Sequence, residues 1–243
     1  MLVTFSPAKS SPTVDCQPSK KTEKVEVVTV YDGDTLRLRG GRDIRLIGID
    51  TPEMGRNGQP DKTGALDAKV SLQRLIKQSE GVVYLQSGSQ PRDRYHRWLA
   101  HLYTREGKNL TQEMLQKGLG YQIAVPPNLS HQTCYQNAES EARDAALGLW
   151  RNPVQDVSTL KGDETGFYHL RGRIVRVGQS RSALWLNLMG GLAIRITWDD
   201  WSKFTPSAPE ELVSHNIELR GWLYQRNGEQ RVRLRHPSAI RWL

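Results

Sequence analysis

Apolar and polar residues alternate along two separate parts of the chain, a pattern typical of half-buried β-strands. The first part predicts strands at residues 25–30, 35–39, 44–49, 82–85 and 98–103. The second part predicts strands at residues 169–177, 183–188, 192–197, 216–224 and 230–235. The chain is therefore expected to be a mainly β protein with some helix, of the α+β class, built from two strand-rich units.

Apolar residues at spacings of three and four predict helices between the strands of the first unit, at residues 63–78, 109–117 and 130–150. Asn109 and Gln112 have the spacing of a capping box, which is typical of a helix start. A helix-like interruption near residues 201–213 separates strands of the second unit. The predicted organisation is an N-terminal arm at 1–24, a first domain at 25–152, a polar linker at 153–166 and a second domain at 167–243.

Residues 31–53 form the most informative stretch. Two predicted strands are joined there by Gly40-Gly41, because glycine tolerates the positive φ that short hairpin turns require. Antiparallel pairing would carry the end of the second strand back to the start of the first. The hairpin is thus expected to bring together three carboxylates and one arginine: Asp34, Asp50, Glu53 and Arg45.

Clustered carboxylates repel one another unless a cation neutralises them, and their hard oxygens favour Ca²⁺ or Mg²⁺ over zinc or iron. A divalent ion beside a free carboxylate and an arginine can hydrolyse a phosphodiester. Taken alone, an Asp-Gly pair is usually a turn, and an Asp-Thr-Pro-Glu run is usually the end of a strand. The combination of these residues at this spacing favours an active site.

Three motifs occur in order along the first unit: Asp32-Gly33-Asp34-Thr35, the run RLIGIDTPE from Arg45 to Glu53, and the run DRYHR from Asp93 to Arg97. Together they resemble the staphylococcal nuclease (thermonuclease) family, and the similarity extends over about residues 25–150. The resemblance implies a five-stranded OB-fold barrel that carries three helices. It also implies a Ca²⁺-dependent nuclease that hydrolyses the phosphodiester bonds of DNA, RNA or both, and we expect it to prefer unpaired strands.

The resemblance also implies roles for individual residues. Glu53 would orient or deprotonate the attacking water, while Arg45 and Arg97 would bind the scissile phosphate and the charge that develops on it. Oxygen atoms of three residues would ligate Ca²⁺, namely Asp34, Asp50 and the carbonyl of Thr51.

The chain departs from the family where other members often place tyrosines over the nucleotide, because Ala124 and Pro126 stand near those positions. This departure bears on how a nucleotide is gripped and leaves the metal chemistry intact. Candidate nucleic-acid contacts in this domain are Arg94, with Tyr95 and Tyr121 as residues that could stack on a base.

The second unit resembles, by its strand pattern, the OB barrels that bind single strands or tRNA anticodons. Such barrels stack bases on aromatic side chains and pair phosphates with arginine. On this basis the second barrel is expected to aid substrate binding through Trp185, Trp222, Arg231 and Arg233. Two alternatives stay open: at least half of the tryptophans in this unit pack in the core, or the barrel binds a protein or a wall polymer.

The net charge of +8 and the pI of about 9.6 favour a polyanionic partner such as DNA or RNA, although many basic proteins have none. Because no apolar run approaches ~20 residues, we do not expect insertion into a membrane. A monomer is expected. The competing hypothesis is a non-catalytic tandem OB module that binds nucleic acid or protein. It is disfavoured because such relatives typically lack an acidic or arginine position that is filled in this chain.

Cys16 and Cys134 are either two free thiols or a disulfide that ties the N-terminal arm to the first domain. A disulfide would imply an oxidising compartment. The resemblance to exported bacterial nucleases favours the disulfide, and with it a periplasmic or secreted location. The first residues do not read as a signal peptide, however, so that a cytoplasmic location stays open.

Overall fold

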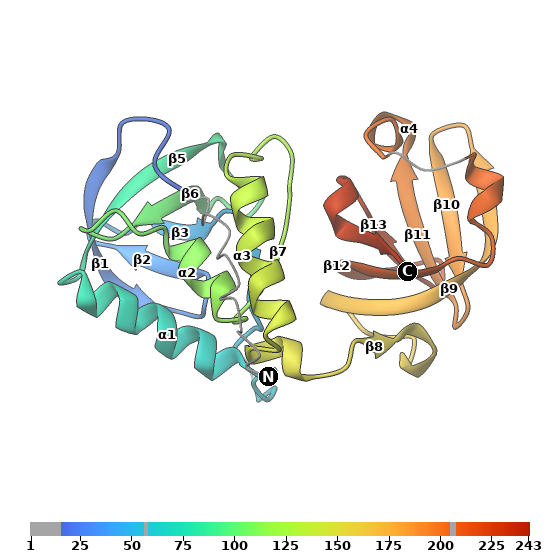
Figure 1. Cartoon of the computed structure of the whole chain (residues 1–243), viewed down its shortest axis with the longest axis horizontal. Coiled ribbons are helices and arrows are strands. Elements are labelled where there is room, and N and C mark those ends of the chain that lie inside the picture. The colour runs from blue at the N-terminus through green and yellow to red at the C-terminus, as the bar shows by residue number, and fades with distance from the viewer. Residues whose placement is uncertain (1–15, 56–57, 205–207) are drawn as a thin grey trace, which may run out of the picture.

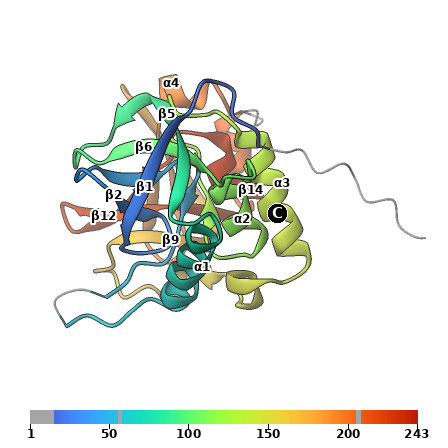
Figure 2. The same cartoon turned by 90° about the vertical axis from the view of Figure 1, so that its left-hand side faces the viewer.

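Two β-barrels lie side by side in the computed structural model, which describes residues 16–55, 58–204 and 208–243 (Figure 1). Most of the predicted N-terminal arm, residues 1–15, lies outside the described residues. Viewed from one end, one barrel stands in front of the other (Figure 2). Within the described ranges, no helix has the length and apolar character needed to cross a membrane. The predicted α+β class with two barrels is confirmed.

The first barrel closes through five strands in the order β1-β2-β3-β6-β5. Strand β3 runs parallel to β6, and the other neighbours are antiparallel. The strands are β1 (Glu23–Val30), β2 (Thr35–Leu38), β3 (Asp43–Leu46), β5 (Val82–Arg92) and β6 (Trp98–Tyr103). The predicted three helices pack around it, namely α1 (Ala65–Gln78), α2 (Leu110–Gln116) and α3 (Gln132–Asp144), and a 3₁₀ turn η1 (Gly148–Arg151) follows.

Local signals in the sequence place the helices well. The buried face of α1 consists of the apolar residues at helical spacing, Ala65, Ala68, Leu72, Leu75 and Ile76. Asn109 caps α2, because its side chain accepts a hydrogen bond from the backbone N–H of Gln112 at 3.1 Å. These contacts anchor the helices on the barrel without contributing to a site.

The return strand of the hairpin is split, whereas the sequence predicted one continuous strand over residues 44–49. Gly48 has a φ of 91°, which ends β3 and starts a separate strand β4 (Ile49–Asp50). A Cβ at position 48 would lie 2.3 Å from the ring of Tyr135, so that only glycine fits there. Strand β4 leaves the barrel and pairs with β7 (Tyr121–Gln122) in a two-stranded sheet.

Two further predictions on element boundaries were wrong. Strand β5 continues to Arg92, where a turn over residues 87–91 was predicted. The side chain of Asn128 accepts from the N–H of Gln90 at 2.9 Å and donates to its carbonyl at 3.0 Å, and so takes the place of a neighbouring strand. The predicted helix over residues 130–150 ends at Asp144, because Ala146 and Gly148 adopt positive φ angles of 48° and 52°.

The second barrel repeats the strand order of the first. Strand β12 pairs back to β9 and closes the ring, and β11 runs parallel to β13 as β3 does to β6. In ring order the strands are β9 (Gly166–Ser180), β10 (Ala183–Leu188), β11 (Leu192–Thr197), β13 (Glu229–Arg233) and β12 (Asn216–Arg226). The accessory elements are α4 (Trp198–Trp201), η3 (Pro209–Leu212), η4 (Pro237–Ala239) and β14 (Ile240–Trp242).

Part of the segment predicted as a polar linker packs on the second barrel. Strand β8 (Gln155–Asp156) pairs in parallel with β9, and η2 (Val157–Thr159) follows it. Val157 is fully buried in the second apolar core. Although residues 153–166 are mostly polar, Val157 among them packs in the core of the second barrel. The second barrel therefore begins before residue 167.

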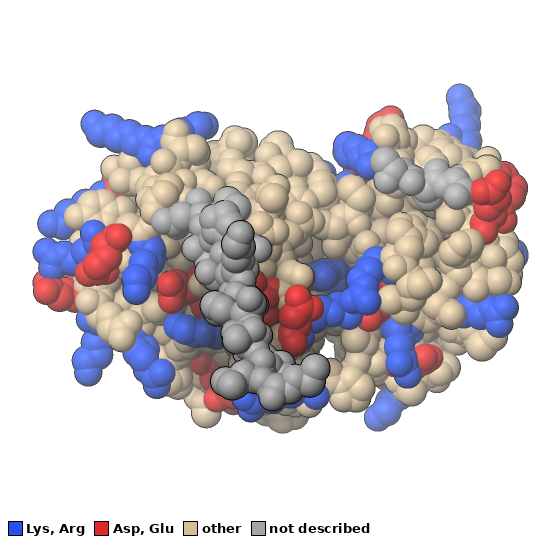
Figure 3. Space-filling model, viewed as in Figure 1, with Lys and Arg blue, Asp and Glu red and all other residues tan. Residues whose placement is uncertain are grey.

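Helix α3 lies on the side of the first barrel that faces the second, and its side chains pair with those of β12 (Figure 1). Arg143 of α3 donates to both carboxylate oxygens of Glu218 at 2.8 and 2.7 Å. In the opposite direction, Arg220 of β12 donates to Glu139 of α3 at 2.6 and 2.7 Å. Positive and negative side chains are interspersed where the barrels meet (Figure 3). Ion pairs thus fasten the barrels together in addition to the covalent connection.

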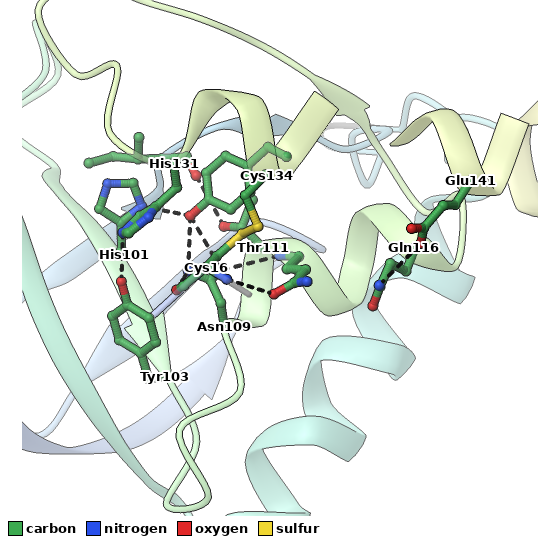
Figure 4. The surroundings of a disulfide bond; sticks show 12 residues. Cys16, His101, Tyr103, Asn109, Thr111, Gln116, His131, Cys134 and Glu141 are labelled. Atoms are coloured by element: carbon green, nitrogen blue, oxygen red, sulfur yellow. Dashed lines mark hydrogen bonds between the residues drawn. A yellow bond between two sulfur atoms is a disulfide. The ribbon is translucent and has the colours of Figure 1, made fainter. Parts of the chain in front are cut away.

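Cys16 and Cys134 form a disulfide that joins the N-terminal segment to α3, with a Cα–Cα distance of 5.8 Å (Figure 4). Asn109 reinforces this attachment, because its side-chain amide donates to the carbonyl of Cys16 at 3.3 Å and to the hydroxyl of Tyr135 at 3.1 Å. Both cysteines are buried in the first core. Of the two possibilities left by the sequence, the structure shows the disulfide.

Removing this disulfide should destabilise the protein, since it closes a chain segment of 118 residues. We expect the double variant Cys16→Ser/Cys134→Ser to lose about 2–5 kcal/mol of unfolding free energy in urea titrations. A reductant should lower the stability of the unmodified protein to that of the variant and leave the variant itself unchanged. Equal stability of the two proteins without reductant would contradict a structural disulfide.

Candidate active site

Asp34 and Asp50 converge on Arg45 at the outer face of β3, because Ile44 and Leu46 on either side of Arg45 point into the barrel core. Asp34 directly precedes β2, Asp50 ends β4, and Arg45 lies on β3 between them. The guanidinium forms an ion pair with Asp34 through Nη1 and donates from Nη2 to Asp50 at 2.5 Å. All three residues are buried, with exposures of 3%, 4% and 8%. The hairpin therefore gathers these residues as the pairing argument predicted.

Thr51 is held against the same carboxylate. Its backbone N–H donates to Asp34 at 2.7 Å, and its hydroxyl donates to the same oxygen at 3.0 Å. The hydroxyl of Thr35 donates to the other oxygen of Asp34 at 2.9 Å. Asp34 is thus fixed in one orientation, and the residue whose carbonyl was predicted as a ligand is adjacent to it.

The environment of Asp50 is poor in positive charge. Burial is the largest influence and raises the pKa of Asp50 to about 6, against the opposing effect of Arg45. The negative charges of Glu53 and Asp32 raise the pKa further, and Lys62 opposes them. Glu53 is exposed at the rim of this cluster. The carboxylates therefore lie closely enough to interact, and among the described residues Arg45 is the guanidinium in direct contact with them.

The residues present suit a hard divalent cation. Asp32, Asp34 and Asp50 are buried carboxylates, and a cation would offset the burial and, to a smaller extent, the repulsion that raise the pKa of Asp50. Nη1 of Arg45 is buried and makes no hydrogen bond of normal geometry within the described residues. Among those residues no three His, Cys, Asp or Glu side chains converge as a preformed metal cluster. The oxygens that would hold Ca²⁺ remain those of Asp34, Asp50 and Thr51.

Arg97 lies apart from the carboxylates in this structure. It stands in the turn after β5, where its Nε donates to Asp93 at 2.8 Å and its backbone N–H donates to the same side chain at 3.0 Å. Its charge also contributes to a lowered pKa of Asp43 at the start of β3. The carboxylate of Asp93 therefore fixes Arg97, and the structure does not bring this guanidinium into contact with Asp34, Asp50 or Glu53.

The other predicted contacts in this domain divide into exposed and covered residues. Tyr95 is 62% exposed, and Arg94 donates to its hydroxyl at 2.6 Å, so both side chains are on the surface. Tyr121 does not present a free face for a base, contrary to the stacking role considered for it. Its ring is packed between Trp150 at 5.4 Å, Phe167 at 5.8 Å and His169 at 5.2 Å, at the junction of the barrels.

The four candidates on the second barrel lie on its outer surface. Buried leucines flank Trp185 along β10, and Val232 is buried between Arg231 and Arg233 on β13, so the candidates point away from the core. The guanidinium of Arg231 stands 4.9 Å from the ring of Trp185, and Trp222 is 45% exposed. Four tryptophans precede the last strand of this unit, and two of them, Trp198 and Trp201, pack against the core, which confirms the core-packing alternative for half of these four.

Comparison with known proteins decides the family. A thermonuclease of Staphylococcus hyicus is 30% identical over 131 residues, which are 52% of this chain and 75% of that protein. A thermonuclease of Staphylococcus intermedius is 30% identical over 53% of this chain and 76% of its own length. The chain belongs to the staphylococcal nuclease family.

The family model described as "Staphylococcal nuclease homologue" matches residues 43–152, which contain the second and third motifs. An uncharacterised endonuclease of Escherichia coli O157:H7 is similar as well, with 31% identity over 51% of this chain and 74% of that protein. Membership in the staphylococcal nuclease family, predicted from the motifs, is confirmed. It makes the protein a nuclease-type hydrolase, and the matched segment corresponds to the first barrel.

Sequence reasoning missed the residues that hold β7 against β4. Glu139 of α3 accepts from the backbone N–H of Gln122 at 2.6 Å, and Arg220 donates to the carbonyl of Gln122 at 2.9 Å. The three residues are far apart in the chain and belong to no local motif. A charged residue on the apolar side of a helix, as Glu139 is, was the one available signal.

Replacing Asp50 by asparagine should stabilise the metal-free protein above pH 6. The pKa of Asp50 is higher in the folded protein than its ordinary value of 3.8, so the folded state binds more protons and loses stability as the pH rises from about 4 to 6. Asp50→Asn lacks this loss, and we expect a gain of about 1–3 kcal/mol at pH 8 in chelator. Urea titrations at pH 4 and pH 8 measure it, and a variant less stable than the unmodified protein at pH 8 would contradict it.

Proposed function

We propose that the protein is a calcium-dependent nuclease that hydrolyses phosphodiester bonds of DNA, RNA or both, with a preference for unpaired strands. The observation that supports this most directly is the buried cluster of Asp34, Asp50 and Arg45, with Glu53 exposed at its edge. Such a cluster combines oxygen ligands for a cation with a donor for phosphate. Membership in the staphylococcal nuclease family supports the same reaction.

In this mechanism each residue has a separate task. Oxygens of Asp34, Asp50 and Thr51 would hold Ca²⁺. The bound ion would supply positive charge to a non-bridging oxygen of the phosphate. Glu53, at the exposed rim, accepts a proton from the attacking water or orients it. The guanidinium of Arg45 donates to the phosphate and stabilises the charge that develops during attack.

Arg97 can take part while it stays bound to Asp93. Its Nε is engaged by Asp93, while its side chain is partly exposed, so that a phosphate could bind at the Nη edge of the same guanidinium. Planar guanidinium groups bind a carboxylate and a phosphate through different edges without changing charge. We therefore assign Arg97 a phosphate contact made from its position in the turn after β5.

We propose that the second barrel helps to hold the single strand. Its outer surface carries the pair formed by Trp185 and Arg231, and Arg195 stands 6.0 Å from the same indole ring. Bases stack on aromatic faces and phosphates pair with guanidinium groups, a combination that binds unpaired strands without requiring a specific sequence. The surface lies on strands β10, β11 and β13 of the barrel.

Lys62 connects this barrel to the loop that follows the carboxylates. Its backbone N–H donates to the carbonyl of Glu53 at 3.1 Å, and its ammonium group reaches the carbonyl of Phe167 at 3.4 Å and the face of Tyr168 at 5.1 Å. The ring of Phe167 is in turn 5.1 Å from Trp222. These contacts support a substrate path that leads from Glu53 past Lys62 to Trp222.

The disulfide supports a location in an oxidising compartment, and we propose that the protein is exported. Disulfides persist in secreted and periplasmic proteins and are rare in the reducing cytosol. The bond between Cys16 and Cys134 joins segments of one compact domain, as expected of a structural disulfide. Fractionation of the native host, with detection of the protein in periplasm or medium, tests this location.

Substitution of Glu53 by glutamine should lower turnover on a single-stranded oligonucleotide by at least about 10²-fold, because the amide cannot accept a proton. The activity of the unmodified protein should disappear in chelator and return with Ca²⁺. Glu26→Gln is the matched control, since Glu26 is a surface residue of the same barrel whose side chain pairs with Arg39. Near-normal turnover of Glu53→Gln, or hydrolysis that persists in chelator, would contradict the mechanism.

Truncation of Trp222 tests the role assigned to the second barrel. We expect Trp222→Ala to weaken binding of a single-stranded oligonucleotide by about 1–3 kcal/mol, with a smaller effect on duplex DNA, because stacking requires an unpaired base. Trp242→Ala is the control, as this tryptophan is also exposed and lies on β14, beside Ile217 at the other end of β12. Equal losses in both variants, measured by fluorescence anisotropy, would remove nucleic acid as the ligand of this surface.

A further inference from the structure

The strand that carries Asp50 depends on a partner that is itself very short. Strands β4 and β7 have two residues each, and their sheet contains no other strand among the described residues. Asp50 is paired with Tyr121, and Ile49 is paired with Gln122. An isolated pair of strands is marginally stable in water, so other contacts must hold β7 in place.

A buried charge pair provides these contacts. The carboxylate of Glu139 accepts the N–H of Gln122 at 2.6 Å, and Arg220 donates to the carbonyl of the same residue at 2.9 Å. Arg220 also donates to both oxygens of Glu139 at 2.6 and 2.7 Å. Both backbone groups of Gln122 are therefore bound by a single Arg–Glu unit, and one half of that unit comes from the second barrel.

Aromatic packing acts at the neighbouring residue. Tyr121, opposite Asp50 in the ladder, contacts Phe167 and His169 of the second barrel as well as Trp150 of the first. The two residues of β7 are thus fixed from the second barrel, one through its side chain and the other through its backbone. The opposite edge of β7 pairs with β4, the strand that contains Asp50.

We propose that Arg220 is a positioning residue for the candidate metal site, and that the second barrel is a working part of the catalytic domain. Arg220 and Glu139 bind the backbone of Gln122 and so fix β7. Strand β7 pairs with β4 and thereby fixes Asp50. Thr51, the next residue, is then close enough to donate to Asp34. The catalytic part of this inference, an effect of Arg220 on Ca²⁺ binding and turnover, rests on the function proposed above. Its structural part, the control of the β4–β7 ladder from the second barrel, is independent of that function.

Removal of Arg220 leaves Glu139 as a buried carboxylate, 7% exposed, with a single amide donor. A buried carboxylate that has lost its charge partner is destabilised, and a turn of its side chain toward water would break its bond to Gln122. Strand β7 then loses the contacts that hold it on the edge opposite β4. The three bonds of Arg220 to Glu139 and Gln122 all come from its Nη1. Lysine at position 220 keeps a charged nitrogen with several donors but carries it on a shorter side chain, so it should restore part of the effect.

The experiment compares Arg220→Ala, Arg220→Lys and Arg143→Ala in the full-length protein. Arg143→Ala is the matched control, because it breaks a different ion pair of the junction, and the described contacts of Arg143, with Glu218 and the ring of Trp150, include neither β7 nor Glu139. Amide hydrogen exchange at Ile123, whose N–H donates to Gly48 at 3.1 Å, reports the ladder directly. Calorimetric titration with Ca²⁺ and separate kcat and KM values report the site.

We expect Arg220→Ala to speed exchange at Ile123 by at least about tenfold, to weaken Ca²⁺ binding by about tenfold and to lower kcat more than it raises KM. Arg220→Lys should lie between this variant and the unmodified protein, and Arg143→Ala should leave exchange at Ile123 unchanged. Unchanged exchange and Ca²⁺ affinity in Arg220→Ala, or equal effects in Arg143→Ala, would overturn the proposal. If the unmodified protein binds no Ca²⁺, the proposed function fails, while exchange at Ile123 still decides the role of Arg220.

Discussion

An excess of buried negative charge beside one guanidinium is the constraint on which the rest of the first barrel depends. Asp32, Asp34 and Asp50 are taken out of water while Arg45 alone contacts two of them. Burial of carboxylates costs stability, and the raised pKa of Asp50 records that cost. Thr51 and Thr35 fix Asp34, and the backbone N–H of Asp34 fixes Asp32, whereas Asp50 is held by the guanidinium of Arg45.

The break in the hairpin at Gly48 makes this arrangement possible. A continuous strand over residues 44–49 would keep Asp50 in the barrel wall and leave β4 without a separate ladder. The left-handed turn at Gly48 instead directs β4 toward β7, and the carbonyl of Gly48 then accepts the N–H of Ile123. The position of one acidic side chain thus depends on a glycine, a short ladder and the elements that support it from behind.

The two barrels share one topology and place their polar chemistry on different sides. The first buries its charged cluster between β3 and the separate strand β4, whereas the second displays arginines and tryptophans on its outer strands. Residues 161–243 contain 13 Lys and Arg against 8 Asp and Glu, a net charge of +5, so more than half of the total of +8 lies in about a third of the chain. The candidate catalytic site therefore lies on the first barrel and the proposed nucleic-acid-binding surface on the second, although both barrels have the same topology.

Local patterns predicted what is locally determined. Alternation located all ten barrel strands, the double glycine at 40–41 gave a turn with both φ angles positive, and the motif spacing brought Asp34, Arg45 and Asp50 together. Contacts distant in sequence were not predictable in this way. The extension of β5 depends on Asn128, Val157 packs in a core built mostly from later residues, and Tyr121 is covered by rings from the second barrel. The position of the Arg97 guanidinium was not predictable either, because its Nε donates to Asp93 and not to the carboxylate cluster.

The junction and the site respond to acid in a defined order. A hydrogen bond from His169 and the ion pair with Arg143 lower the pKa of Glu218 to about 2, and burial lowers the pKa of His169, which leaves that imidazole neutral at pH 7. The stability that Glu218 contributes is present above its ordinary pKa of 4.5 and is lost as the pH falls toward 2. Asp50 takes up its proton near pH 6. The pKa of this candidate metal ligand therefore lies above that of Glu218, so that on acidification Asp50 is neutralised before the ion pair of Glu218 with Arg143 is lost.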